Sequence, residues 1–339
     1  LSHRNAGADM AMRRLLRPIT ALAFVLVGGC DEQFNPVEDF QPQMIIYGML
    51  ETTRDTQYVR VSSSYDPPEH NPANQTTDSA LTGTSVVVIG GTPANGTTVF
   101  FQPTLLTRWN NDRYTTPVPA FVAPGFRVER GGIYSLFVSS PLGQATASVT
   151  VPTVSYVFTA DDMVLRAPQN SPRNREINFR SILSPVTYGF FMRLLVDYEV
   201  AVPGGWEART IEIPRTLLRD DSIATMIGTY PQLRRRTTQG VTTTTERETF
   251  FAGPYFRIVQ LLRQRYKPAG ALRFLRARAI LYQTDEAFYR YVKTVNGFND
   301  QFTIRTDEPD VSNITNGRGL FAIVTTDTST VTLPDVLGL

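Results

Sequence analysis

Segments in which apolar and polar residues alternate constrain the fold of this chain more than any other feature of its sequence. In residues 145–151, alanine and valine occupy every second position, and threonine and serine occupy the positions between them. A period of two is typical of an antiparallel strand that is buried on one face only. Further strands are expected at 44–50, 58–62, 85–89, 98–101 and 132–138. We therefore predict a mainly β fold.

Turn residues divide these strands at short intervals. Asn95-Gly96 and Arg130-Gly131-Gly132 are two such turns, and Pro152 follows the last strand. Short strands joined by turns over roughly 110 residues are typical of a sandwich of two antiparallel sheets. We therefore predict an immunoglobulin-like β-sandwich over residues 42–152. The stretch 63–84, which is rich in proline and polar residues, is expected to be a mobile loop.

The C-terminal part of the sequence combines strands with two helices. Strands are expected at 154–158, 190–200, 210–213, 273–282 and from 318 onward. Apolar residues recur at helical spacing behind Pro254, which predicts a helix over 255–266. Thr284 is expected to cap a second helix over 285–296. We therefore predict a β-rich C-terminal domain over residues 153–339 with two short helices.

The pattern also predicts which side chains of this domain face its core. Residues 190–200 carry apolar side chains at the even positions, with Arg193 and Asp197 on the other face. Residues 275–281 carry apolar side chains at the odd positions, and each set should therefore pack inward. The threonine-rich and arginine-rich run 233–249 is expected to form an extended hairpin or a disordered loop.

The N-terminal segment predicts secretion and lipid attachment. Basic residues precede the apolar stretch 19–27, and Gly28-Gly29-Cys30 follows it and resembles the lipobox of bacterial lipoproteins. A basic start, a short apolar stretch and small residues before the cleavage point are typical of a signal peptide. We assign it to 1–29, with 1–9 as upstream read-through. Cys30, the single cysteine, is expected to carry the lipid, and residues 30–41 are expected to form a lipidated tether.

The scarcity of reactive side chains excludes several kinds of chemistry. The chain has one cysteine and two histidines, of which only His70 follows the signal peptide. A disulfide within the chain and a zinc site of cysteine and histidine are therefore excluded, and we expect no cofactor. Without the signal peptide, 29 basic and 30 acidic residues remain. The positive field typical of nucleic-acid binding is therefore absent.

One stretch of the C-terminal part is rich in arginine. It includes Arg257, Arg273, Arg276 and Arg278. Guanidinium groups can hold an anion by paired hydrogen bonds, although an exposed charged face without a ligand is the alternative. We predict a patch for an anion or another ligand at these four residues, and no metal site. Asp78-Ser79-Ala80 and Asp221-Ser222-Ile223 also resemble the O-glycosylation sites of secreted proteins of Bacteroidota.

Two segments near the C-terminus resemble those of a known family. Residues 284–291 and 311–321, taken with Cys30 and the acidic residues after it, resemble a domain-of-unknown-function family of Bacteroidota outer-membrane lipoproteins. The resemblance covers Cys30 to about Ala322, and Arg318 departs from the family's pattern. Members of this family are commonly encoded beside TonB-dependent transporters. The resemblance implies a lipid-anchored protein of the outer membrane that is exposed at the cell surface, and it transfers no catalytic residues.

From the residues and the resemblance together we expect a protein that is not an enzyme. It would bind a glycan or peptide nutrient, or stabilise the assembly, for a TonB-dependent transporter, and its lipid would be its contact with the membrane. The sequence leaves two alternatives open. One is a carboxylate-based hydrolase of the glycosidase type, because paired acids need neither histidine nor cysteine. The other is a structural subunit of a surface adhesin or polymer.

Overall fold

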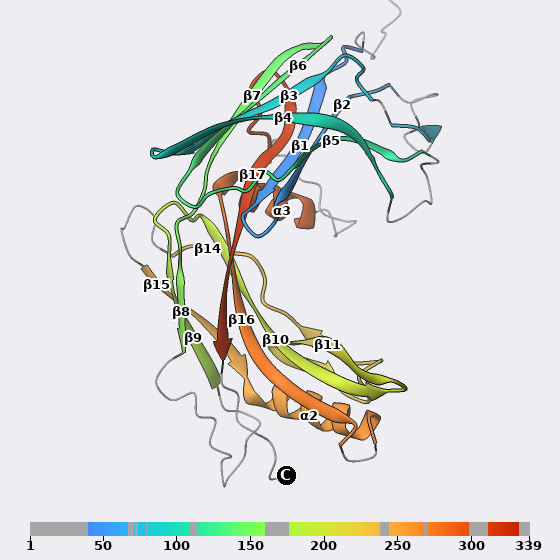
Figure 1. Cartoon of the computed structure of the whole chain (residues 1–339), viewed down its shortest axis with the longest axis vertical. Helices are drawn as coiled ribbons and strands as arrows, with labels where there is room; N and C mark the ends of the chain where they lie inside the picture. Colours follow the sequence, from blue (N-terminus) through green and yellow to red (C-terminus); the bar gives the residue numbers. More distant parts are fainter. Residues whose placement is uncertain are drawn as a thin grey trace, which may run out of the picture. The chain divides into compact units, whose positions relative to one another are not determined.

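The computed structural model describes residues 40–66, 71, 74–78, 80–108, 114, 116–159, 176–237, 244–267, 270–297 and 311–331 (Figure 1). All described strands and helices belong to one compact unit, Pro42–Leu339. In this part of the chain the fold is mainly β with two helices, as predicted. The signal peptide, Cys30 and His70 lie outside the described residues, as does the tether up to residue 39. Their roles stay predictions.

The described strands at the N-terminal end form a β-sandwich. They are β1 (Met44–Glu51), β2 (Thr56–Ser63), β3 (Ser85–Thr92), β4 (Asn95–Leu106), β5 (Val118–Pro124), β6 (Ile133–Ser140) and β7 (Gly143–Thr150). β1, β2 and β5 pair on one side, and β3, β6 and β7 pair on the other. β4 joins the two sides, because residues 95–101 pair with β3 and residues 102–106 pair with β5.

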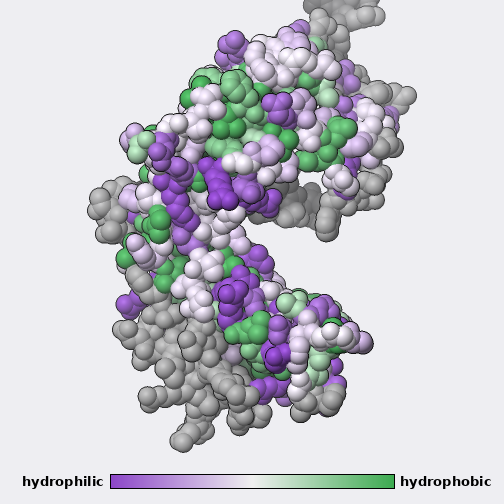
Figure 2. Space-filling view, in the orientation of Figure 1, coloured by the Kyte–Doolittle hydropathy of each residue, from purple (hydrophilic) through white to green (hydrophobic). Residues whose placement is uncertain are grey.

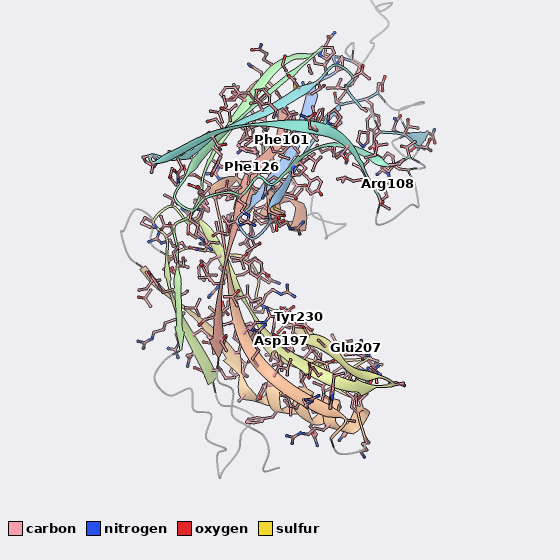
Figure 3. All side chains as sticks on the ribbon, in the orientation of Figure 1. Phe101, Arg108, Phe126, Asp197, Glu207 and Tyr230 are labelled. Carbon is pink, nitrogen blue, oxygen red and sulfur yellow. The ribbon has the colours of Figure 1, made fainter. Side chains whose placement is uncertain are left out.

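Alternation along the strands supplies the core of this sandwich. On β7, Ala145, Ala147 and Val149 are buried and the residues between them are exposed, as the period of two predicts. Phe101 and Phe126 meet edge to face inside the core, with ring centroids 6.1 Å apart (Figure 3). Such a pair contributes beyond the area that it buries. The core therefore forms where the sequence predicts it.

Apolar side chains also lie on the outside of the sandwich. Phe100 on β4 is 66% exposed and Ile89 on β3 is 46% exposed. Figure 2 shows hydrophobic residues among the strands that Figure 1 labels β3 and β4. Phe100 of β4 pairs with Val87 of β3, and Val87 pairs on its other side with Phe137 of β6. The outer face therefore carries a short row of apolar side chains across three strands.

The second core lies among the strands that follow and a helix. The strands are β8 (Tyr156–Thr159), β9 (Glu176–Leu183), β10 (Gly189–Val202), β11 (Gly205–Ile213), β12 (Thr216–Arg219), β13 (Ile227–Thr229), β14 (Arg234–Arg235), β15 (Thr244–Phe251) and β16 (Leu272–Thr284). Helix α2 (Ala252–Arg265) buries Tyr255, Ile258 and Leu262 in this core, as its spacing predicts. The even positions of β10 are buried there too, which confirms the predicted inward face.

The predicted inward face of β16 is wrong at Leu275. The odd positions from 277 to 281 are buried, but Leu275 is 53% exposed. The register between β10 and β16 shifts here, so that Tyr198 pairs with Phe274 and Leu275 is skipped. A bulge inserts one residue and turns the side chains beyond it to the other face. Phe274 now pairs with Tyr198, with ring centroids 6.5 Å apart, although its side chain is still 37% exposed.

The last described strand, β17 (Arg318–Val331), connects the two groups of strands. Residues 318–324 pair in parallel with β1, and residues 324–331 pair antiparallel with β16. Phe321 and Ile323 belong to the first core, although they come from the end of the chain. The predicted domain boundary between residues 152 and 153 stays a prediction.

Three local predictions are wrong. The turn that was expected at Asn95-Gly96 lies instead at residues 93 and 94, between β3 and β4. Asn95 already pairs with Thr92, and Pro93 has the fixed φ that suits a turn. The run 233–249 forms neither one hairpin nor a wholly irregular loop, since its strand β14 pairs with β10 and its strand β15 pairs with β9. Thr284 does not cap the second helix, for it ends β16 and donates its hydroxyl to the carbonyl of Gly189.

Candidate functional site

The four arginines predicted as a ligand patch lie on two elements of the fold. Arg273, Arg276 and Arg278 are on β16, and Arg257 is on α2. Each forms an ion pair with a carboxylate from another element, namely Arg257 with Asp220, Arg273 with Glu199, and both Arg276 and Arg278 with Asp197. The structure therefore surrounds these arginines with acids that are distant in sequence. Their role as a ligand patch stays a prediction.

Asp197 of β10 illustrates this balance (Figure 3). Its Oδ2 lies 2.9 Å from Nε of Arg276, and its Oδ1 lies 2.6 Å from Nη2 of Arg278. The hydroxyl of Thr210 also donates to Oδ1 at 2.8 Å. Burial alone would raise the pKa of this carboxyl, but the hydrogen bonds from both arginines and the hydroxyl outweigh burial and lower the pKa to about 2. Asp197 is therefore ionised at neutral pH.

A second group of cations lines a cavity that the sequence did not predict. The cavity has a volume of about 610 Å³, which is typical of a site for a small molecule. Its wall includes the cations Arg215, Arg234, Arg235 and Lys293 and the aromatic residues Tyr230, Phe251 and Tyr289. No carboxylate is among the described residues of this wall. We call the cavity with these residues the cationic pocket. Figure 3 labels Tyr230.

Strand β14 positions two of these arginines. It pairs with the first residues of β10, so that Arg235 lies opposite Gly189. Arg234 lies opposite Phe190, and its guanidinium carbon is 5.0 Å from the centroid of that ring. The guanidinium carbon of Arg235 is 5.0 Å from the ring centroid of Tyr188. Neighbouring residues of a strand face opposite ways, so the two arginines contact different aromatic rings.

A buried carboxylate holds Arg234 and Arg215 together. The side chain of Glu248 on β15 is 2% exposed, and its Oε2 lies 2.6 Å from Nη2 of Arg234. Its Oε1 lies 3.3 Å from Nη2 of Arg215. Burial raises the pKa of Glu248 above its usual range, although both arginines act in the opposite direction. Two of the four cations are thereby fixed by a carboxylate that burial makes less acidic.

Helix α3 (Glu286–Gly297) contributes two further residues to the wall of the pocket. Tyr289 and Lys293 are one helical turn apart, and Nζ of Lys293 lies 5.7 Å from the ring centroid of Tyr289. The rings of Tyr289 and Tyr188 have centroids 5.3 Å apart. A Cβ at Gly189 would lie 2.8 Å from Cδ2 of Tyr289, so only glycine allows the helix this position. The approach of α3 therefore depends on Gly189.

Asp285 fixes the start of this helix. Its Oδ1 accepts the backbone N–H of Phe288 at 2.9 Å, which is the bond expected of an N-cap residue. Burial raises the pKa of this carboxyl to about 7, against the opposing effect of the backbone N–H groups that it accepts. The cap was predicted one residue too early, at Thr284.

The remaining wall of the pocket is polar but uncharged. The hydroxyl oxygens of Thr216 on β12 and Thr229 on β13 are 2.5 Å apart and share a hydrogen bond. Tyr230 and Gln232, which follow β13 in sequence, also line the pocket. Hydroxyl, amide and aromatic groups can bind the uncharged part of a ligand by hydrogen bonds and ring contacts. The pocket therefore combines a cationic wall with a neutral one.

One signal in the sequence could have indicated this site. Three consecutive arginines, Arg234-Arg235-Arg236, fall in the run 233–249. The third is buried at 2% exposure and donates to the carbonyls of Ser184 and Pro185, both at 2.8 Å. The first two line the pocket. Lys293 has no such signal, because it is brought to the site by the packing of α3.

Other kinds of site are not found in the described part of the chain. Within the described ranges, no group of three or more His, Cys, Asp or Glu side chains could hold a metal ion. The described helices include none that is long and apolar enough to cross a membrane. The cationic pocket is the cavity that we take as the candidate functional site, because it gathers four cations beside aromatic and hydroxyl groups.

Comparison with known proteins places the chain in a family. None of the curated proteins matches the sequence. A family model described as a domain of unknown function, DUF4249, matches residues 31–330. Since this match spans most of the 339 residues and covers the described strands and helices up to the last residue but one of β17, the chain belongs to the DUF4249 family.

Proposed function

We propose that this chain is a lipoprotein of the outer membrane of Bacteroidota that binds a nutrient for a TonB-dependent transporter without catalysing a reaction. In this proposal Cys30 carries the lipid, and the body is exposed at the cell surface. The family match begins at residue 31, directly after Cys30, which supports a mature body that starts there. The sequence before Cys30 has the basic start and apolar stretch of a secretory signal.

The observation that carries the proposal is the cationic pocket. Its volume of about 610 Å³ suits a small molecule, and it offers both charged and neutral groups for recognition. Its described wall contains cations, hydroxyls and aromatic rings, while Glu248 behind it is already engaged by Arg215 and Arg234. This set can bind and orient a ligand. It supports binding rather than hydrolysis by a pair of carboxyl groups facing a common cleft.

Membrane attachment is tested by a Cys30→Ala variant. Its body is expected in the soluble fraction, whereas the wild-type chain is expected in the outer-membrane fraction, because the acyl chains provide the anchor. Protease added to intact cells should degrade the wild-type body. A Cys30→Ala chain that stays bound to membranes would contradict the anchor.

The partner is tested by purification from detergent-solubilised outer membranes. The wild-type chain is expected to bring a TonB-dependent transporter with it. Recovery of the chain free of any transporter, combined with full protection from protease in intact cells, would contradict the proposed function.

A further inference from the structure

We propose that the cationic pocket recognises its ligand through an oxyanion, which can be a carboxylate, phosphate or sulfate group, and that Arg235 and Lys293 hold this group. The inference rests on the proposed binding function and names the class of ligand. The two side chains come from strand β14 and helix α3, which are far apart in sequence. The site therefore exists only in the folded chain.

The described wall of the pocket is strongly positive. Arg215, Arg234, Arg235 and Lys293 bring four positive charges to its wall. Among the described residues, Glu248 is the one carboxylate that forms an ion pair with any of them. Counted over the described lining and Glu248, an excess of three positive charges is left around one hollow. Such an excess attracts anions and raises their local concentration.

The four cations differ in the groups that already bind them. Arg215 and Arg234 share Glu248 and also donate to backbone carbonyls, those of Thr249 and Arg247, at 3.2 and 2.9 Å. In the described ranges, Arg235 and Lys293 form no ion pair. Both are exposed, so their donors can reach a ligand in the pocket.

Aromatic rings hold Arg235 and Lys293 in place. Arg235 lies over Tyr188 and Lys293 lies beside Tyr289, at 5.0 and 5.7 Å from the ring centroids. A ring attracts a cation through its quadrupole but offers no anionic oxygen, so the charge is not neutralised. The planar edge of a guanidinium group still matches the two oxygens of an oxyanion. The arrangement is therefore ready for an anion before one arrives.

The ligand can be a free oxyanion or an acidic sugar, and these two sources are distinguished by experiment. The hydroxyls of Thr216 and Thr229 and the amide of Gln232 would contact an uncharged body attached to the oxyanion. Galacturonate contains such an uncharged part, whereas inorganic phosphate does not. Galactose has nearly the same body without the charge.

Calorimetric titration of the full-length lipoprotein in detergent uses galacturonate, inorganic phosphate and galactose as probes. We expect at least one oxyanion to bind, and to bind at least tenfold more tightly than galactose, with weaker binding at higher salt. Tighter binding of galacturonate than of phosphate would identify an acidic sugar, and equal binding would identify the free oxyanion. Galactose binding as tightly as galacturonate, or no binding of either oxyanion, would overturn the proposal.

Variants locate the binding at the pocket. The double variant R235Q/K293Q should weaken oxyanion binding at least tenfold, because it removes two charged donors. The matched control is R265Q, since Arg265 is also an exposed arginine over a ring, that of Tyr266, but lies on α2 and does not line the pocket. R265Q should bind as the wild type does. Unchanged binding by the double variant would overturn the proposal.

The outcome of this titration is separate from that of the proposed function. Co-purification with a transporter does not depend on which ligand fills the pocket. A chain that keeps its transporter but binds no oxyanion would overturn the ligand class alone, whereas a chain that binds an oxyanion but has no transporter would overturn the proposed uptake role alone.

Discussion

Two buried carboxylates of this protein have the same kind of partners in different surroundings. Asp197 lies between Arg276 and Arg278, and Glu248 lies between Arg215 and Arg234. The pKa of Asp197 is lowered to about 2, whereas that of Glu248 is raised. Two arginines are therefore not enough to decide the charge state of an acid.

The difference follows from the balance of burial and hydrogen bonding at each carboxylate. Both of the arginines at Asp197 donate hydrogen bonds to it, and Thr210 adds another. Glu248 is more deeply buried, and its Oε1 has no hydrogen bond within the described part of the chain. Removing a charge from water costs free energy that only good hydrogen bonds and close charges offset. Asp197 thus stabilises its arginines strongly, while the Glu248 cluster keeps unbalanced positive charge at the pocket.

The comparison predicts unequal effects of isosteric neutral variants. Asp197→Asn should lower the free energy of unfolding by about 2 kcal/mol near pH 7, because the folded state favours the ionised carboxylate. Glu248→Gln should change it by less than about 0.5 kcal/mol, since burial of the charge offsets the attraction of the arginines. Urea unfolding of both variants measures these values. Equal losses would contradict the account given for the two sites.

Asp197 and Glu248 also differ in how their contributions to stability depend on pH. The folded pKa of Asp197 is below its unfolded value, so its contribution is present above pH 4 and is lost as the pH falls toward 2. The gap between the wild type and Asp197→Asn should therefore close over this range. For Glu248 the stability should change with pH in the opposite direction. Because its folded pKa is raised, its contribution to stability declines as the pH rises above its unfolded pKa. A gap that stays constant down to pH 2 would contradict the role of Asp197.

A smaller effect tests how the pocket depends on packing. A Cβ at Gly189 would lie 2.7 Å from Oγ1 of Thr284 and 2.8 Å from Cδ2 of Tyr289. Gly189→Ala should therefore cost about 1.5 kcal/mol and displace Tyr289 from the pocket. The matched control is Gly96→Ala on β4, where a Cβ would have no neighbour within 4 Å. The control should unfold within about 0.5 kcal/mol of the wild type.

Thermal unfolding of the two glycine variants gives the comparison directly. Near-ultraviolet circular dichroism would also report the changed surroundings of the tyrosines in Gly189→Ala. Equal stability of the two variants would show that α3 can move without cost, and would remove the argument that Gly189 positions the pocket.

The sequence predicts the fold better than the site, for a physical reason. The inward faces of β7 and β10 follow from alternation, which depends only on residues within each strand. The prediction is wrong at Leu275 because a bulge depends on the partner strand, and the alternation within β16 does not reveal it. Pairing of β14 with β10 and of β15 with β9 is likewise a property of the folded chain.

The arginines of β16 form a pattern that is visible in the sequence, whereas those of β14 do not. Near Arg273, Arg276 and Arg278 the local sequence has few acids, but their carboxylate partners come from β10, about eighty positions earlier. Arg234 and Arg235 lie in a run that lacks a strand pattern, and Lys293 joins them only through the packing of α3. A charge balance counted along the sequence is therefore a poor guide to a charge balance in space.

A third carboxylate, that of Asp285, is partly buried and forms no ion pair within the described residues. Its pKa is raised to about 7, so the folded chain keeps a proton that the unfolded chain loses above pH 4. Stability should accordingly decline as the pH rises from about 4 to 7. Asp285→Asn does not titrate and still accepts the N–H of Phe288, as asparagine is a good N-cap residue.

The free energy of unfolding of this variant, relative to that of the wild type, should therefore rise by about 2 kcal/mol between pH 5 and pH 8.5, because the pKa of the folded carboxyl is about 7. Asp285→Ala separates the cap from the charge, because it should lose about 1 kcal/mol at pH 5 through the missing acceptor. Urea unfolding at the two pH values measures both variants. If Asp285→Asn were less stable than the wild type at pH 8.5, the ionised carboxylate would be stabilising α3. The lack of an arginine partner would then not explain why Asp285 differs from Asp197.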